Sequence, residues 1–359
     1  MSAPTLPSAH AVHNRARELV LEYGWNSTAY QILNPGFELW FSRLHPAVVG
    51  YVRAGGRWVV GGAPVAADAK LRDVADEFER DAAAHHAGVV YFGAEERIES
   101  LYRGTTTHSA ILLGAQPAWN PDQWTGIIAS HASLRAQLNR ARNKHVSVAL
   151  WPSERAEHNP ELKNLLKEWL GTRGLPPLHF LVEPETLGKL QDRRVFVATR
   201  EDVPVGFLVA SPIPARNGWL TEQFVRGHNA PNGTAEMMID SAVCWVATQQ
   251  AGYVTLGLAP LSSRAGAMVS QSFLIRLGFK WVRAHGRRFY NFAGLDTFKA
   301  KFCPDRWEAV YAISNEHRFS IRSLYAIASA FTQGRPFRTV AHGLAQAGRQ
   351  EMAWLQHHG

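Results

Sequence analysis

The feature of this sequence that most constrains its fold is an alternation of strand-like and helix-like segments that occurs twice along the chain. In the first half, residues 47–53 and 57–62 are rich in valine and aromatic residues and flank Gly55 and Gly56, a pattern that predicts a β-hairpin. Apolar residues then recur at helical spacing in residues 69–86, which predicts an amphipathic helix. Further strands are expected at residues 88–94 and 109–115, followed by one helix over residues 127–143.

The second half repeats this alternation. The segments expected there are a strand at residues 146–153, a helix at 159–174, a hairpin at 193–213, a buried helix at 234–252 and a strand at 253–261. We therefore expect an α/β (α+β) chain with mixed sheets flanked by helices, divided into domains over residues 1–145 and 146–317 with C-terminal helices over 318–359. A chain of 359 residues suffices for two cores, because single cores stop growing at about 250–300 residues.

Charge and missing motifs narrow the class of function. Lysine and arginine number 38 against 30 acidic residues, and the net charge of +8 favours an anionic partner such as nucleic acid or a lipid surface. Cys244 and Cys303 are too few for a disulfide framework or a cysteine zinc site, and neither an H-E-x-x-H motif nor a P-loop occurs. We expect no metal and no ATP. Without 18 consecutive apolar residues or a secretory signal, we also expect no transmembrane segment and a cytoplasmic protein.

Residues 289–311 combine aromatic rings, an amide and two lysines. Leucine and phenylalanine recur at helical spacing over residues 295–302, and we expect Lys299 and Lys301 to point away from this apolar stripe. A short helix between strands would then hold two ammonium groups near an anionic ligand. A solvated lysine pair over an aromatic core is the alternative.

Two loops are candidate binding sites. Arg226, His228, Asn232 and Gly233 lie in a loop before the predicted helix that starts at 234. Free N–H groups at such a helix N-terminus favour an anion or an oxyanion, although a capped turn explains the same residues. Ser262 and Ser263 follow a predicted strand. Ligands often bind at strand ends in α/β proteins, and a helix cap is the alternative for these serines.

Basic residues are dense in the region that follows. The members of this set are Lys280, Arg283, Arg287, Arg288, Lys299, Lys301 and Arg306. Basic groups neutralise phosphates and aromatic rings stack on unpaired bases, so the region suits a tRNA acceptor end. A second basic set, at Arg135, Arg140, Arg142 and Lys144, is better explained as a solvated helix face.

Together these segments resemble the C-terminal catalytic part of the phosphatidylglycerol lysyltransferase (multiple peptide resistance factor) family. The family pattern N-F-x-G-L-x-x-[FY]-K-x-K-F-x-P-x-W-x-x-x-Y stands here, with one extra residue before the tryptophan, at Asn291, Phe292, Gly294, Leu295, Phe298, Lys299, Lys301, Phe302, Pro304, Trp307 and Tyr311. Further similar segments lie at residues 37–42, 48–65, 134–142, 229–240 and 256–263, so the resemblance covers roughly residues 30–315.

The resemblance implies tandem GNAT-like acyltransferase domains, with the catalytic site in the second unit. It implies a donor already activated as an ester on tRNA, so that aminoacyl-tRNA is the co-substrate and no other cofactor is needed. The acceptor is a hydroxyl or an amine. It belongs either to a phosphatidylglycerol-type lipid headgroup, reached by peripheral contact with the anionic inner face of the membrane, or to a soluble natural-product precursor.

The same reasoning assigns roles to individual residues. The catalytic candidates are Lys299, Lys301, Arg226, Glu222 and Tyr311, and the substrate-binding candidates are Asn232, Gly233, His228, Glu236, Ser262, Ser263, Asn291 and Trp307. The candidates for tRNA binding are Lys280, Arg283, Arg287 and Arg288. The family commonly carries an acidic residue three positions before the arginine at 226, where this chain has Gln223 beside Glu222.

Two other functions remain open from the sequence. A CoA-dependent GNAT N-acyltransferase usually presents a [QR]-x-x-G-x-[GA] loop, and the nearest segment here, residues 283–288, lacks the final small residue. A non-enzymatic protein that binds nucleic acid through its basic surface is the other alternative.

Overall fold

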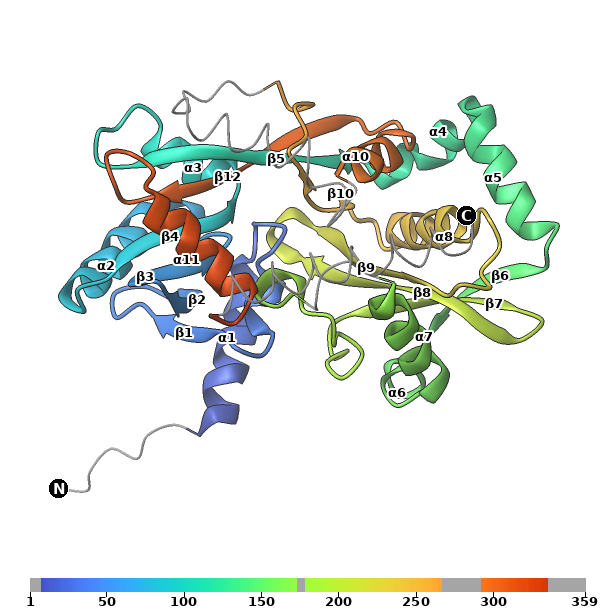
Figure 1. Cartoon of the computed structure of the whole chain (residues 1–359), viewed down its shortest axis with the longest axis horizontal. Coiled ribbons are helices and arrows are strands. Elements are labelled where there is room, and N and C mark those ends of the chain that lie inside the picture. Colours follow the sequence, from blue (N-terminus) through green and yellow to red (C-terminus); the bar gives the residue numbers. More distant parts are fainter. Residues whose placement is uncertain (1–7, 173–177, 267–291, 335–359) are drawn as a thin grey trace, which may run out of the picture.

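A 12-stranded mixed sheet runs through the protein (Figure 1). The computed structural model describes residues 8–172, 178–266 and 292–334. The strands lie in the order β1 (Glu38–Phe41), β2 (Val48–Ala54), β3 (Arg57–Gly61), β4 (Gly88–Ala94), β12 (Arg306–Ser314), β5 (Ser109–Trp119), β10 (Tyr253–Thr255), β9 (Gly218–Arg226), β8 (Val203–Ile213), β7 (Arg194–Arg200) and β6 (Val146–Trp151), and β11 (Ala259–Pro260) also pairs with β5.

Helices cover both faces of this sheet. Around its β1–β4 end lie α1 (Ala9–Tyr23), η1 (Tyr30–Leu33), η2 (Asp68–Lys70), α2 (Leu71–Ala84), α3 (Glu96–Tyr102), η4 (Phe180–Val182) and α11 (Ile321–Phe331). Around the β6–β10 end lie η3 (Pro121–Gln123), α4 (Trp124–Ser130), α5 (Ala132–Arg142), α6 (Ser153–Glu157), α7 (Pro160–Gly171), η5 (Pro214–Arg216), α8 (Thr234–Thr248) and α10 (Phe292–Ala300). The predicted fold class, a mixed sheet flanked by helices, is confirmed.

Local sequence signals explain several of these elements. Gly55 and Gly56 both have positive φ, at 57° and 73°, and join β2 to β3 in the predicted hairpin. Helix α7 begins where Asn159 accepts hydrogen bonds from two backbone N–H groups and Pro160 occupies the first helical position. The single helix predicted over residues 127–143 is wrong. His131 adopts an extended conformation (φ −109°, ψ 99°) that separates α4 from α5.

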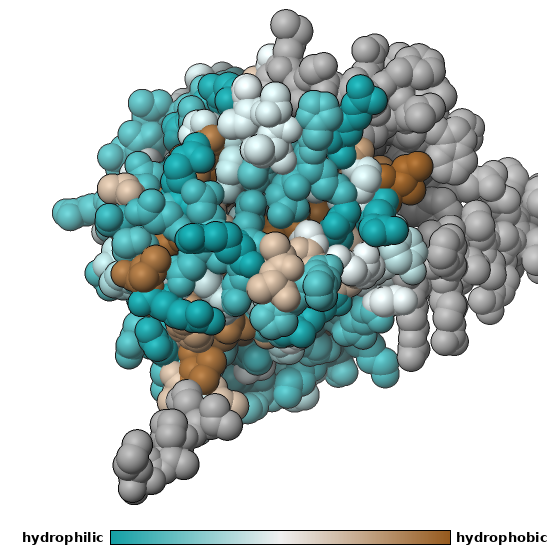
Figure 2. Space-filling model, turned by 90° about the vertical axis from the view of Figure 1, so that its left-hand side faces the viewer, coloured by the Kyte–Doolittle hydropathy of each residue, from teal (hydrophilic) through white to brown (hydrophobic). Residues whose placement is uncertain are grey.

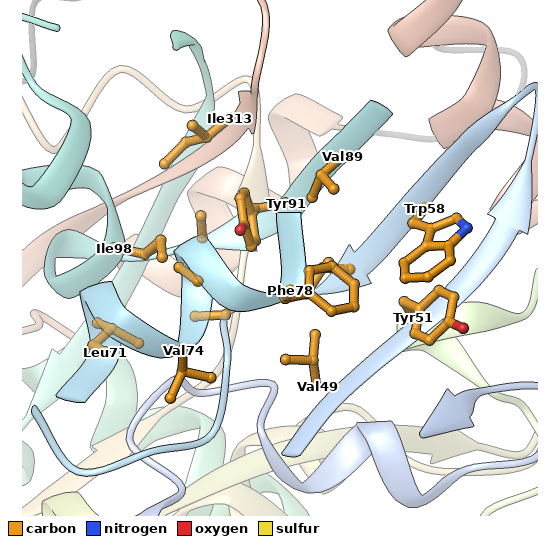
Figure 3. Packing of buried hydrophobic residues seen from close by; sticks show 14 of the residues in the cluster. Val49, Tyr51, Trp58, Leu71, Val74, Phe78, Val89, Tyr91, Ile98 and Ile313 are labelled. Atoms are coloured by element: carbon orange, nitrogen blue, oxygen red, sulfur yellow. The ribbon is translucent and has the colours of Figure 1, made fainter. Parts of the chain in front are cut away.

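Strand β12 joins the two halves of the chain. Its sequence lies in the segment predicted as the second domain, yet β12 pairs with β4 on one side and β5 on the other. Figure 3 shows its Ile313 in one apolar cluster with Phe78, Tyr91 and Ile98. The core near the N-terminus is therefore completed by a strand near residue 310, and the sheet continues across the domain boundary predicted at residue 145.

A buried network of charges reinforces this junction. The guanidinium of Arg216 donates to Glu95, at the end of β4, over 3.0 Å and to Glu308, on β12, over 2.7 Å. Tyr253 of β10 donates to Glu308 over 2.8 Å and stacks on Arg216. Burial raises the pKa of Glu95. Burial acts in the same direction on Glu308, but there Arg216 outweighs it and the pKa lies below its usual value.

Neighbouring strands separate at the centre of the sheet. Strand β10 pairs with β9 in parallel over Gly218–Leu220 only, whereas β9 continues to Arg226. After β10 the chain turns to β11, which pairs with β5. Residues 256–258 therefore diverge from β9. We call this place the strand split. In α/β folds, ligands commonly bind where neighbouring strands diverge.

The face of the molecule at the β1–β4 end is mainly hydrophilic, with apolar residues in small separate patches (Figure 2). Within residues 8–172, 178–266 and 292–334, no helix combines the length and the hydropathy required to cross a bilayer.

Candidate functional site

The start of helix α8 is held close to helix α5. Gly233, the residue before the helix, has φ +94°, and a Cβ atom added there would lie 2.1 Å from the carbonyl oxygen of Gln137. The hydroxyl of Thr234 donates to the carbonyl of Pro231 over 2.7 Å, while the side chain of Asn232 is exposed. Only glycine fits this conformation and this approach without strain, so the predicted loop before α8 is a tightly built turn.

Two predicted site residues meet beside this turn. The ammonium of Lys301, just past the end of α10, lies 2.5 Å from a carboxylate oxygen of Glu236, in the first turn of α8. The same ammonium lies 4.1 Å from the centre of the Phe298 ring. Glu236 is largely buried, and Lys301 is about one-third exposed, at 31% of its side chain. An ion pair between Lys301 and Glu236 thus lies at the N-terminus of α8.

Lys299 makes a different set of contacts. Its Nζ donates to the carbonyl oxygens of Leu256, Gly257 and Leu258 over 2.7, 2.8 and 2.8 Å, and the residue is only 5% exposed. The prediction that Lys299 points away from the apolar stripe is therefore wrong. Lys299 lies four residues after Leu295, so helical spacing itself places it on the buried face.

These contacts fix one edge of the strand split. The three carbonyls belong to the residues that leave β10, where they have no strand partner among the described hydrogen bonds. A protonated amine has three N–H donors, one for each carbonyl, and a neutral amine still has two. Burial lowers the pKa of Lys299 to about 7, and Asp296 acts in the opposite direction. Lys299 therefore holds the backbone of residues 256–258 at the strand split from a buried position.

The serine loop lies next to α10. The hydroxyl of Ser262 is buried and accepts from the backbone N–H of Arg264, while Ser263 is exposed. Arg264 pairs with Asp296 of α10 over 2.9 Å and its guanidinium lies 5.3 Å from the centre of the Trp307 ring. Trp307 is thus linked to α10 through Arg264.

Glu222 lies on β9 but is fully engaged. Its two carboxylate oxygens accept from Arg193 over 2.7 and 2.9 Å, and both side chains are buried. Arg193 also donates to Asn34. The neighbouring Gln223 accepts from Thr186 over 2.6 Å and donates to the carbonyl of Pro184. Both residues therefore anchor the middle of β9 to the segments that pack against it.

The structure does not bring three other candidates to the Lys301–Glu236 pair. Tyr311 is buried in the apolar cluster of the β1–β4 end. His228 lies 3.0 Å from Glu168 of α7 at an exposed position. Arg226, at the end of β9, is exposed. The predicted positions Lys280, Arg283, Arg287, Arg288 and Asn291 lie outside the described residues.

Sequence reasoning missed Arg193 and Arg264, whose guanidinium groups organise β9 and α10. Neither has a local signal, because Arg193 meets Glu222 and Arg264 meets Asp296 only through the fold. In the part of the chain that the structure describes, no group of three or more histidine, cysteine or acidic side chains is arranged to hold a metal ion.

Comparison with known proteins identifies the family. Residues 17–314 match the family model of the phosphatidylglycerol lysyltransferase C-terminal domain, so this chain belongs to that family. Its fold is similar to that of a putative lysylphosphatidylglycerol synthetase C-terminal domain from Agrobacterium fabrum (TM-score 0.73, 20% identity, 91% of this chain and 99% of that one). It is also similar to L-PGS from Bacillus licheniformis (0.71, 22%, 91% and 96%).

A more distant similarity is to FemX, with a TM-score of 0.53 and 9% identity over 91% of this chain and 99% of that one. No curated protein sequence matches this chain. The family and the fold expected from residues 289–311 and the other similar segments are thereby confirmed.

Replacing Gly233 should destabilise the protein. We expect Gly233→Ala to lower the free energy of unfolding by about 2 kcal/mol, because the new Cβ meets the Gln137 carbonyl and the φ angle is unfavourable for alanine. Gly171→Ala is the matched control, since a Cβ there has open space. Equal urea midpoints for the two variants would contradict the tight approach of α8 to α5.

Replacing Lys299 should cost more stability than replacing a surface lysine. Lys299→Met leaves three carbonyls without donors, and we expect a loss of about 3 kcal/mol in the free energy of unfolding, measured with urea. Lys163→Met, at an exposed position of α7, should change it by less than about 0.5 kcal/mol. Similar losses in both variants would contradict the stabilisation of these carbonyls by Lys299.

The stability contributed by Lys299 should also depend on pH. Its pKa is lowered from 10.5 in the unfolded chain to about 7 in the native one, so between these values the unfolded chain binds more protons. Stability therefore rises with pH across this window and is lost as the pH falls through 7. The difference in unfolding free energy between wild type and Lys299→Met should grow by about 1 kcal/mol per pH unit from pH 7 to 9. A constant difference would show that Lys299 titrates normally.

Proposed function

We propose that this protein transfers an aminoacyl group from aminoacyl-tRNA to a hydroxyl or amine acceptor. Its family is named for a lysyltransferase, and the solved neighbours include lysylphosphatidylglycerol synthetase domains and FemX. The observation that carries the proposal is the Lys301–Glu236 pair at the start of α8, beside the strand split. It places a cation, which can stabilise an oxyanion, beside a carboxylate, which can accept a proton, and both tasks arise in acyl transfer from an ester.

The reaction needs positioning, charge stabilisation and one proton transfer. The acceptor nucleophile attacks the ester carbonyl, a new bond to that carbon forms, and the bond to the ribose oxygen breaks. We assign to Lys301 the stabilisation of the oxyanion or of the adjacent phosphate. Glu236 is the group placed to accept the proton of the nucleophile, and the departing ribose oxygen takes up a proton through it or through the neighbouring ribose hydroxyl.

Other predicted residues take supporting roles in this scheme. The amine of Lys299 donates to the backbone carbonyls of residues 256–258, so we assign to Lys299 the role of holding the backbone at the strand split. Glu222 holds β9 through Arg193, which leaves it no free carboxylate oxygen for general-base catalysis. Arg226 is exposed at the end of β9 and adds positive charge for the tRNA phosphates, and Asn232 and the Gly233 amide position the substrate at the start of α8.

The ester on the tRNA already carries the energy for transfer, so the scheme uses no ATP and no further cofactor. Two acceptor classes fit a nucleophile delivered to this point. One is a phosphatidylglycerol-type headgroup, which requires contact with the anionic inner face of the membrane. The other is a soluble amine or hydroxyl compound. We place the reaction in the cytoplasm in both cases, because charged tRNA is the donor.

The direct test is to incubate the full chain with a pool of tRNAs charged with radiolabelled amino acids. One arm contains vesicles of phosphatidylglycerol, one contains vesicles of a neutral phospholipid, and one contains a soluble amine such as hydroxylamine. Label in lipid or amine product that survives RNase, in excess of the amount formed without protein, supports the proposal and names the acceptor class. Loss of label from tRNA at the uncatalysed rate in every arm would refute it.

Lys301 should matter for transfer far more than for folding. We expect Lys301→Ala to reduce the transfer rate about 100-fold, the cost typical of removing one oxyanion-stabilising donor. Lys163→Ala, which removes an exposed lysine of α7, should keep the wild-type rate. If Lys301→Ala turns over like wild type, the assigned role is wrong.

A further inference from the structure

The structure pairs a cysteine and a histidine that lie 172 positions apart in the sequence. The sulfur of Cys303, in the turn after α10, lies 3.0 Å from Nε2 of His131, at the break between α4 and α5. Neither residue takes part in the scheme proposed above. Cys303 is partly exposed, and so is His131.

The contact of the other ring nitrogen fixes the tautomer of the neutral His131 ring. Its Nδ1 lies 2.8 Å from the carbonyl oxygen of Ile127, and a carbonyl oxygen can only accept. Nδ1 therefore carries a hydrogen, and in the neutral ring Nε2 presents a lone pair toward the sulfur. The hydroxyl of Ser130 donates to the same carbonyl over 3.0 Å. The lone pair is thus aimed at the thiol as a base would be.

Cys303 is held in place from its own side as well. Its backbone N–H donates to the carbonyl of Ala300 over 3.0 Å, and the residue has φ +49°. The preceding carbonyl, of Phe302, accepts from the indole of Trp119 over 2.9 Å. The thiol therefore lies on a fixed turn rather than on a freely moving loop.

Cys244 provides an internal comparison. It is exposed on α8, and its sulfur lies 3.9 Å from a carboxylate oxygen of Asp240. Although the residue is exposed, its sulfur is partly buried against its neighbours, and this burial together with Asp240 raises the pKa of the thiol to about 11. Exposure alone predicts that Cys244 reacts faster than Cys303. The neighbouring groups predict the reverse order. The thiolate is the reactive form, and Asp240 disfavours it at Cys244, whereas His131 can accept the proton of Cys303.

We propose that Cys303 is a nucleophilic thiol that His131 activates, and that it is a site of covalent modification by peroxides and other small electrophiles. With hydrogen peroxide, the sulfur attacks one oxygen, the O–O bond breaks and a sulfenic acid forms. His131 accepts the thiol proton and returns it to the departing hydroxide, which leaves as water. The sulfur is oxidised and the peroxide is reduced, so the step is balanced.

The test measures alkylation of the full chain by iodoacetamide at pH 7, with both cysteine peptides followed by mass spectrometry. We expect Cys303 to react about tenfold faster than Cys244. His131→Gln should remove most of this advantage, while His158→Gln, the same change at an exposed position after α6, should retain it. A rate for Cys303 equal to or below that of Cys244 would overturn the proposal, as would an unchanged rate in His131→Gln.

A second measurement does not depend on the folding of any variant. Wild-type protein is treated with hydrogen peroxide and then with dimedone, which labels sulfenic acids. Label on the Cys303 peptide in excess over the Cys244 peptide is the expected result. Equal labelling, or label on Cys244 alone, would count against activation by His131.

Discussion

The ammonium of Lys299 lies in the interior and donates to three successive backbone carbonyls, and much of the second half of the chain depends on this contact. The carbonyls belong to residues that have left β10 and have not yet reached β11, so no neighbouring strand satisfies them in the described sheet. Buried carbonyls without donors are costly. By satisfying them from α10, Lys299 both holds the strand split and fixes the helix, which ends at Ala300, immediately before Lys301. The position of Lys301 opposite Glu236 follows from that anchoring.

A second constraint keeps this arrangement attached to the rest of the sheet. Strand β12 follows α10 directly and enters the sheet between β4 and β5, so that β5 separates it from β10 and β11, the strands that precede α10 in the sequence. Glu308 on β12 meets Arg216, just before β9, and Tyr253, at the start of β10, so it contacts the parallel β9–β10 pair at the end where both strands begin. Movement of α10 is therefore coupled to both halves of the sheet. Cys303 lies in the turn between α10 and β12, where its pairing with His131 also ties this connection to the α4–α5 break.

The sequence predicted those features whose causes are local. Gly55 and Gly56 permit the tight turn of a hairpin, and Asn159 with Pro160 marks the start of α7, so both elements were expected where they occur. The break at His131 carries no glycine or proline, and a helix was wrongly continued through it. The spacing of Leu295, Phe298 and Phe302 predicts that Lys299 points away from the apolar stripe, but its position four residues after Leu295 puts it on the buried face. The pairing of β12 with β4 and the ion pair of Arg193 with Glu222 depend on contacts between distant segments. No local sequence pattern predicts either of them.

In the function that we propose, the start of α8 and Lys301 receive the acylated end of tRNA. The most direct measurement is a crystal structure of the full chain with a non-hydrolysable analogue, 3′-amino-3′-deoxyadenosine carrying an amino acid through an amide bond. We predict that the amide oxygen lies within hydrogen-bond distance of Lys301 or of the first N–H groups of α8, and that the Lys301–Glu236 contact lengthens. An analogue bound elsewhere, with that contact unchanged, would contradict the account.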